Sequence, residues 1–149
     1  MKSNSGNSND PFGLNRFVQA QEKTYESALS ELRLKQKRSH WMWYIFPQYE
    51  GLGHSSMSKR YSIKSVEEAQ AYLSHSVLGT RLLECTETVV AIEERSATDV
   101  FGVPDDMKLK SSMTLFDYIS ESGSVFALVL DKFYGGVRCA KTLQLLKGG

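Results

Sequence analysis

The chain has 149 residues, a length that fits one domain able to bury about two thirds of its unfolded surface without help from a metal or a disulfide. Its hydrophobic content of 41%, charged content of 23% and formal net charge of +1 are those of an ordinary soluble globular protein. This balance gives no general attraction to nucleic acid or to membranes, so we expect neither as a partner.

Residues 1–9, MKSNSGNSN, are polar and low in complexity, and they predict a disordered tail before a single helical domain at residues 10–147. They contain no apolar signal segment, and no run of about 20 apolar residues follows, so we expect a cytoplasmic protein. The two cysteines and three histidines show no metal-binding spacing. We therefore expect no bound metal and no cofactor, while the oligomeric state stays open.

Two helices are predicted before residue 35. Asp10 and Pro11 suit the N-cap and the first position of a helix whose apolar face starts at Leu14. A second helix should begin near Thr24, because apolar residues recur there at intervals of three and four. The basic residues that follow it, Lys35, Lys37 and Arg38, complement the negative end of that helix, and an anion site is the alternative interpretation.

The densest stretch is residues 37–62, KRSHWMWYIFPQYEGLGHSSMSKRYS. Its aromatic run predicts two helical turns that Pro47 ends, since a residue before proline avoids the helical conformation. Core packing is one interpretation of Trp41 and Trp43, because each ring can bury ~150–250 Å². The alternative is an aromatic-walled ligand pocket with polar tips, to which His40 and Gln48 could contribute.

Residues 48–56 predict a loop that contains Gly51 and Gly53. Two nearby glycines can turn backbone N–H groups toward an anion, and the hydroxyls and basic groups that follow, among them Arg60, could add donors. The Walker and dinucleotide-binding patterns are both absent, so an ordinary turn is the alternative interpretation.

The remainder predicts further helices. Ser65 and Glu68 form a capping pattern for a short helix through Leu73, and apolar spacing predicts a long helix over residues 78–92. Further helical segments are expected at residues 96–101, 104–120, 124–134 and 143–146. No strand alternation occurs, so the fold class should be all-α, a compact domain of about seven or eight helices, several of them short, without a sheet.

The helix that Pro104 opens carries a second group of polar residues, with Lys108, Ser111 and Ser112 on one strip. A serine near a lysine can act as a nucleophile beside its base, although the usual Ser-x-x-Lys order is reversed here. Three further interpretations stay open. The serines can bond to the preceding turn of the helix, or Lys108 can anchor a ligand. Alternatively, Lys108 can form an ion pair, with Asp105 one turn back or with a glutamate elsewhere, Asp105 being one of the acids at the positive start of this helix.

Several segments occur in the order of a known family: SHWMWYIFPQ, GLG, SKRYSI, HSVLGTRL, FGVPDDMKLKSSMTLF and VLDKFYGG. Across residues 10–146 the chain resembles the family named domain of unknown function 1810, a departure being Ser76, where relatives commonly read proline. The resemblance implies a single all-helical domain, and some members are labelled calpastatin-like. It also implies that the following residues lie in the family's motif blocks: His40, Trp43, Gln48, Arg60, Tyr61, Lys108, Ser111, Ser112 and Thr114.

Two functions follow as expectations. The first is binding of a small anionic ligand, such as a nucleotide derivative, in one pocket lined by residues 40–61 and 108–114, with Trp43 or Tyr61 against a ring and Arg60 and Lys108 on an anionic group. The second is a non-enzymatic protein-interaction module in which the same polar residues are structural. Whether the protein is an enzyme stays open at this point.

Overall fold

The computed structural model describes residues 10–148, and the tail expected at residues 1–9 lies outside them. The described residues contain ten helices and no strand, with one isolated parallel bridge between Tyr49 and Ile63, so the all-α class is confirmed. The helices are α1 (Asn15–Glu22), α2 (Tyr25–Arg33), α3 (Met42–Ile45), α4 (Ser56–Arg60), α5 (Val66–Ser74), α6 (Leu78–Val90), α7 (Ala97–Phe101), α8 (Asp105–Tyr118), α9 (Val125–Tyr134) and α10 (Ala140–Gly148).

The helix count exceeds the expected seven or eight because three helices have only four or five residues. No helix is predicted from the sequence between the loop at residues 48–56 and Ser65, but α4 lies there. It begins where the Ser55 hydroxyl accepts the Ser58 N–H at 3.1 Å. α3 is one turn rather than two. α1 begins at Asn15 rather than at Pro11, since the Asp10 carboxylate accepts the N–H groups of Leu14 and Asn15 from outside the helix.

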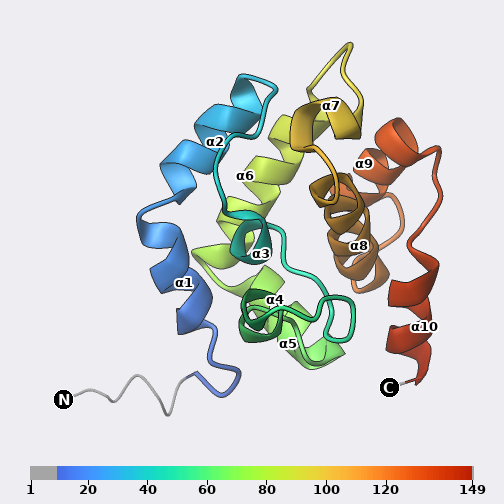
Figure 1. The fold of residues 1–149 in the computed structure, drawn as a ribbon. Helices are drawn as coiled ribbons and strands as arrows, with labels where there is room; N and C mark the ends of the chain where they lie inside the picture. Colours follow the sequence, from blue (N-terminus) through green and yellow to red (C-terminus); the bar gives the residue numbers. More distant parts are fainter. Residues whose placement is uncertain (1–9, 149) are drawn as a thin grey trace.

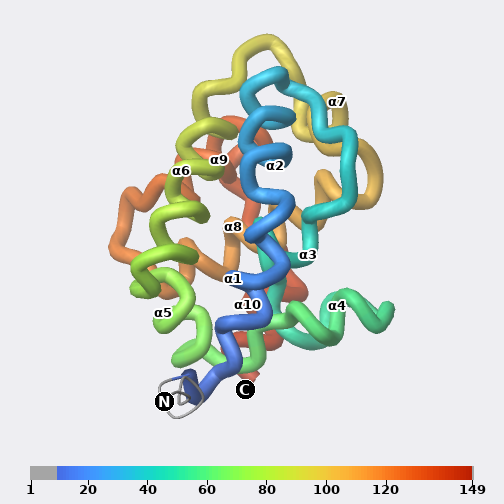
Figure 2. Tube along the Cα trace, turned by 90° about the vertical axis from the view of Figure 1, so that its left-hand side faces the viewer, coloured from blue at the N-terminus to red at the C-terminus, as the bar shows by residue number. Residues whose placement is uncertain are grey.

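The helices pack around α6 and α8. α6 contacts α2, α5 and α9, while α8 contacts α5, α7, α9 and α10. In Figure 1, α2 and α6 lie on one side of the molecule and α8, α9 and α10 on the other, with α3 between them. Figure 2, the view turned by 90°, shows α4 projecting from the side that α3 occupies. The short helices therefore lie on the outside of a frame made by the longer ones.

A single hydrophobic cluster runs through the described helices, from Leu14 to Leu146. Aromatic rings connect four helices within it. The ring centroids of Phe17 and Tyr72 are 5.1 Å apart, those of Tyr72 and Phe116 are 5.5 Å apart, and those of Phe116 and Phe126 are 5.7 Å apart. Such ring pairs add to the stability that their buried area provides.

The segment that leads into α3 is held by the carboxylate of Glu31. This group accepts the N–H of Arg38 at 2.7 Å, the N–H of Ser39 at 3.0 Å and the indole N–H of Trp41 at 2.9 Å. Burial tends to raise the pKa of Glu31, but these bonds and the Ser39 hydroxyl together lower it to about 2. Glu31 therefore satisfies the polar atom of a completely buried tryptophan and fixes the start of α3.

Candidate functional site

A cavity of about 260 Å³ lies between the segment that leads into α3 and the start of α8. Ligand sites usually measure ~300–1,000 Å³, so this cavity is at the small end of the range. Seven residues line it: Lys37, His40, Met42, Trp43, Val103, Pro104 and Asp105. Two stretches that are far apart in sequence thus meet here, residues 37–43 and residues 103–105.

Two ammonium groups share the carboxylate of Asp105. Lys37 lines the cavity, whereas Lys108 does not line it and approaches it through contacts with Asp105 and Trp43, which do. Lys37 Nζ lies 2.9 Å from Asp105 Oδ2, and Lys108 Nζ lies 3.5 Å from Asp105 Oδ1. The Lys37 and Asp105 side chains are 9% and 19% exposed, so this pair is largely shielded from water. Lys37 Nζ also donates to the Ser39 carbonyl at 2.6 Å. The two ammonium groups and the one carboxylate carry a net charge of +1. Each oxygen of Asp105 is already paired with one lysine, so Asp105 cannot balance the second positive charge.

Trp43 supplies the aromatic wall. Its ring is half-buried and packs against the core, and the Lys108 ammonium lies 5.3 Å from the centroid of the ring. Trp41, two residues earlier, is fully buried instead, and the Lys37 ammonium lies 5.0 Å from its ring. His40 is exposed at the rim, and its carbonyl accepts the Tyr44 hydroxyl. Both lysines are therefore placed over tryptophan faces, where a cation is stabilised.

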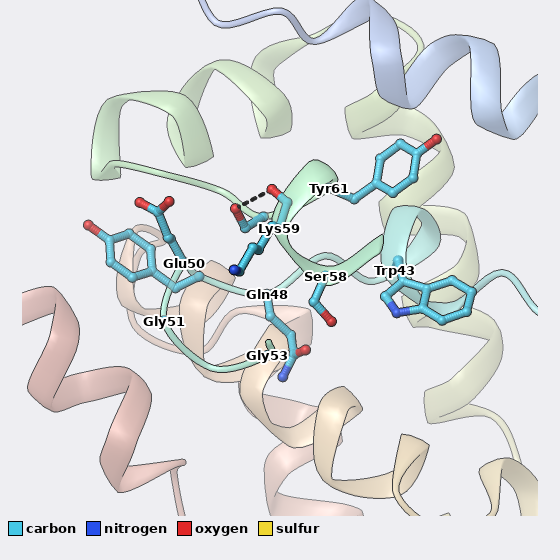
Figure 3. Close-up of a pocket in the computed structure, with 10 residues that line it drawn as sticks. Trp43, Gln48, Glu50, Gly51, Gly53, Ser58, Lys59 and Tyr61 are labelled. Carbon is cyan, nitrogen blue, oxygen red and sulfur yellow. Dashed lines mark hydrogen bonds between the residues drawn. The ribbon is translucent and has the colours of Figure 1, made fainter. Parts of the chain in front are cut away.

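A second, narrower cavity of about 20 Å³ lies on the other side of Trp43, against the loop that precedes α4. Gln48, Ser58 and Tyr61 line it together with the two glycines (Figure 3). The labelled Glu50 and Trp43 lie at opposite ends of this group of residues, and a hydrogen bond of 3.0 Å joins the Ser62 hydroxyl to the Lys59 carbonyl. The volume of this second cavity accommodates about one water molecule.

Backbone geometry and packing explain why residues 51 and 53 of this loop are glycines. Gly51 has φ of +105°, which strains any other residue, and a Cβ at Gly53 would lie 2.4 Å from the Ser58 hydroxyl oxygen. Backbone conformation and close packing thus account for both glycines, as the ordinary-turn interpretation requires.

Arg60 lines neither cavity. Its side chain is exposed, with the guanidinium 5.5 Å from the Tyr61 ring. Arg16 makes the nearby contacts, donating to the carbonyls of Arg60 at 2.7 Å and Ser62 at 2.8 Å and pairing with Glu68 at 2.8 Å. Tyr61 is buried, and its ring centroid lies 5.3 Å from that of Tyr44. The expectation of one pocket lined by both blocks is therefore wrong. Of the residues predicted to line it, His40 and Trp43 line the larger cavity and Trp43, Gln48 and Tyr61 line the smaller one, whereas Arg60, Lys108 and the hydroxyl residues of α8 line neither.

The hydroxyl residues of α8 lie toward the start of α10. Ser111 donates to the Met107 carbonyl at 3.2 Å, and Thr114 donates to the Lys110 carbonyl at 2.8 Å while it accepts the Cys139 N–H at 2.9 Å. Ser112 is fully buried, and its hydroxyl has no hydrogen-bond partner among the described residues. None of the three residues lines either cavity.

Sequence reasoning identifies two of the seven lining residues, His40 and Trp43, and misses the other five, which include the two charged ones, Lys37 and Asp105. The sequence pattern explains Lys37 as a complement to the end of a helix and Asp105 as an acid at the start of another. Each explanation is local, and no local pattern links two charges so far apart in the chain. Among residues 10–148, no group of three or more His, Cys, Asp or Glu side chains could hold a metal ion, and no helix is long and apolar enough to cross a membrane.

Comparisons with known proteins place the chain in a family. A search of curated proteins returned no match. The chain is similar to the conserved hypothetical protein Rv1873 from Mycobacterium tuberculosis, known from a crystal structure at 1.38 Å, with 51% sequence identity, a TM-score of 0.91, and coverage of 93% of this chain and 99% of that one. A family model described as "protein of unknown function (DUF1810)" matches residues 11–146. The chain therefore belongs to the DUF1810 family.

Proposed function

We propose that this protein binds a small anionic ligand that carries a flat ring, such as a nucleotide derivative, in the cavity between α3 and α8. The observation that carries the proposal is the arrangement of Lys37 and Lys108 around the single carboxylate of Asp105, beside the half-buried ring of Trp43. A phosphate or carboxylate group would neutralise the remaining positive charge, and the ring of the ligand would lie against Trp43.

The chemistry around the cavity supports this ligand class. An ammonium group has three donors, and Lys108 contacts no carboxylate other than Asp105 within 4 Å among residues 10–148. Its remaining donors are available for charge-assisted hydrogen bonds, which are the strong ones. The volume of about 260 Å³ suits a ligand no larger than a mononucleotide rather than a whole dinucleotide.

The proposal concerns binding. The residues that line the cavity include no serine, threonine or cysteine. Ser111 contacts Cys139 at the start of α10, and Ser112 is fully buried. The interpretation of Ser111 or Ser112 as a nucleophile beside Lys108 therefore has no support from the geometry.

A thermal-shift screen of the full chain against nucleotides, sugar phosphates and fragments of NAD tests the proposal. A compound that binds should raise the melting temperature in a concentration-dependent way. Replacing Lys108 by methionine keeps most of the packing of the stem but removes a charge-assisted contact, so affinity should fall about 10- to 150-fold.

Lys110→Met is the matched control for this screen, because Lys110 lies on the same helix but its ammonium faces the Tyr134 ring at 5.9 Å. The control variant should bind like the wild type. A ligand that stabilises the Lys108→Met variant as much as the wild type would remove Lys108 as an anchor.

A protein-interaction module is the second candidate, and exposed apolar side chains beside the cavity favour it. Val103 is 78% exposed and Met107 is 53% exposed. In this alternative the apolar residues contact a partner protein, and the lysines and Asp105 hold the loops in place. An empty small-molecule screen would favour this function over the first.

A cytoplasmic location and the lack of nucleic-acid binding stay predictions. Filter retention of single- and double-stranded nucleic acid at several salt concentrations tests the second, since electrostatic binding weakens steeply as salt rises. We expect no retention at any concentration.

A further inference from the structure

Cys139 occupies the N-cap position of α10. Its carbonyl accepts the Leu143 N–H at 3.1 Å, which is the first hydrogen bond of the helix. Its own N–H is taken by the Thr114 hydroxyl of α8 at 2.9 Å. The cysteine is therefore fixed at the start of a nine-residue helix, in the place where a side chain that accepts hydrogen bonds is usual.

Polar groups surround the sulfur. The Ser111 hydroxyl lies 3.4 Å from Cys139 Sγ, and its one proton can go either to this sulfur or to the Met107 carbonyl at 3.2 Å. Thr142 is fully buried, its hydroxyl makes no hydrogen bond of standard geometry among the described residues, and it faces this thiol. Lys141 and Thr142 belong to the first turn of α10, whose backbone N–H groups have no partner within the helix. A buried hydroxyl without a partner is costly, and a thiolate would give the Thr142 hydroxyl the acceptor that it lacks.

These contacts change the acidity of the thiol. Burial acts to raise the pKa of Cys139, but the polar groups around the sulfur, the Ser111 hydroxyl first and then those of Thr142 and Lys141 at the start of α10, outweigh it, so the pKa lies below its usual value. The charged groups on the same elements are engaged elsewhere or exposed. Arg138 pairs with Asp117 at 3.1 Å, Lys110 faces Tyr134, and Lys141 is exposed.

Cys85 provides the contrast within the same chain. It is fully buried in α6, and burial raises its pKa to about 12. Cys139 is partly exposed, so a small reagent can reach it. The two thiols therefore differ both in the fraction that is ionised and in access, the two factors that decide the reactivity of a cysteine.

We propose that Cys139 is a nucleophilic cysteine and a modification site for small hydroperoxides, held ready by Ser111, Thr114 and Thr142. In the reaction, the thiolate sulfur attacks one peroxide oxygen and the oxygen–oxygen bond breaks. The sulfur is oxidised by two electrons to sulfenic acid, and the peroxide is reduced. The leaving oxygen departs as hydroxide from hydrogen peroxide or as alkoxide from an organic hydroperoxide, and it takes up a proton from solvent to become water or an alcohol.

This site is separate from the cavity between α3 and α8, and the inference does not depend on the proposed ligand. It explains the positions of hydroxyl residues of α8 that do not line that cavity. Ser111 and Thr114 position the cysteine from α8, and Thr142 does so from α10.

Hydrogen peroxide with dimedone as a trap for sulfenic acid tests the proposal on the full chain, with the modified cysteine identified by mass spectrometry. We expect one adduct, on Cys139, and none on Cys85 while the chain is folded. The pH midpoint of the rate should lie below that of an unstructured cysteine peptide treated in the same way. An equal or higher midpoint, or labelling of Cys85 at a similar rate, would overturn the proposal.

Thr142→Val is the matched variant, because it removes the hydroxyl but keeps the shape of the side chain. At neutral pH it should slow adduct formation by about threefold to tenfold and raise the midpoint, since sulfur is a weak acceptor and one bond to it contributes modestly. Lack of reaction at Cys85 reports that the variant is folded. A folded variant that reacts like the wild type would contradict the role of Thr142 and, with it, the proposal.

Discussion

At the scale of single residues, Trp41 and Trp43 lie two positions apart but in different environments. Trp41 is fully buried with its N–H on Glu31, whereas Trp43 is half-buried at the cavity. Trp41→Ala should therefore lower the free energy of unfolding by about 3–5 kcal/mol, through lost burial and the cavity left behind. Trp43→Ala should cost about 1–2 kcal/mol, because less of its ring leaves water on folding.

Urea titration of both variants measures these costs. Equal losses near the larger value would mean that Trp43 is a core residue, and its ring would then be unavailable to a ligand.

The shared carboxylate of Asp105 predicts unequal effects of removing its partners. Lys108→Met should change stability by less than about 1 kcal/mol, because Asp105 keeps Lys37 at 2.9 Å and the Lys108 side chain is 24% exposed. Asp105→Asn should cost more, about 1–3 kcal/mol, since it leaves the largely buried Lys37 ammonium without its counter-charge.

The same two variants should change the affinity for an anion in opposite directions. Lys108→Met should lower it, because a positive charge is removed, and Asp105→Asn should raise it, because the net positive charge of the cavity increases. Denaturant titration gives the stabilities and the thermal-shift titration gives the affinities. A loss of several kcal/mol in Lys108→Met would show that this lysine is structural.

Glu31 predicts a dependence of stability on pH. Its pKa in the folded protein is about 2, against a usual value of 4.5, so its contribution is complete above pH 4.5 and is lost as the pH falls toward 2. We expect a loss of about 1–2 kcal/mol over that window, discounted for the partial exposure of the carboxylate.

Glu31→Gln should remove this component, so that the difference in the free energy of unfolding between wild type and variant shrinks as the pH falls. A difference that stays constant from neutral pH to pH 2 would contradict the hydrogen-bonded carboxylate described here.

At the scale of elements, the contact between the end of α5 and the start of α6 depends on Gly79. A Cβ at this position would lie 2.0 Å from the Leu73 carbonyl oxygen, which belongs to the backbone and cannot rotate away. Gly79→Ala should therefore destabilise the protein by about 1–3 kcal/mol, although alanine has the higher helix propensity.

Gly148→Ala is the control, because a Cβ at that helical glycine meets no atom within 4 Å. It should leave the midpoint of thermal unfolding unchanged or slightly raised. A stabilised Gly79→Ala variant would show that the two helices are further apart than described.

Most helices could be predicted because their signals are local. The Ser65 hydroxyl accepts the Glu68 N–H, as the capping pattern predicts, and the apolar spacing of residues 78–92 corresponds to α6 (Leu78–Val90). The helical segments expected at residues 96–101 and 124–134 likewise begin at serine caps. The misplaced elements lack such signals. α4 has no buried residue and so no apolar periodicity, and Asp10 bonds the start of α1 from outside the helix.

At the scale of the whole molecule, the candidate site depends on contacts that no local pattern encodes. The tryptophan block and Lys108 could be singled out by composition, and the fold brings Trp43 and Lys108 together. The pairing of Lys37 with Asp105 could not be predicted, because each charge also has an adequate explanation in its own helix. Likewise, the neighbours of Ser111 are fixed only when α10 packs on α8.

The indole N–H signals of the two tryptophans test the central claim most directly. A nitrogen–proton correlation spectrum should show one signal each for Trp41 and Trp43, assigned with a Trp43→Phe variant. We would titrate the protein with inorganic phosphate, a pentose phosphate and adenosine monophosphate. The account predicts that the Trp43 signal moves with at least one of them and saturates, that the Trp41 signal stays in place, and that Lys108→Met weakens the response while Lys110→Met does not. A Trp43 signal that none of the three compounds moves, or equal movement of both signals, would contradict an anion site between α3 and α8.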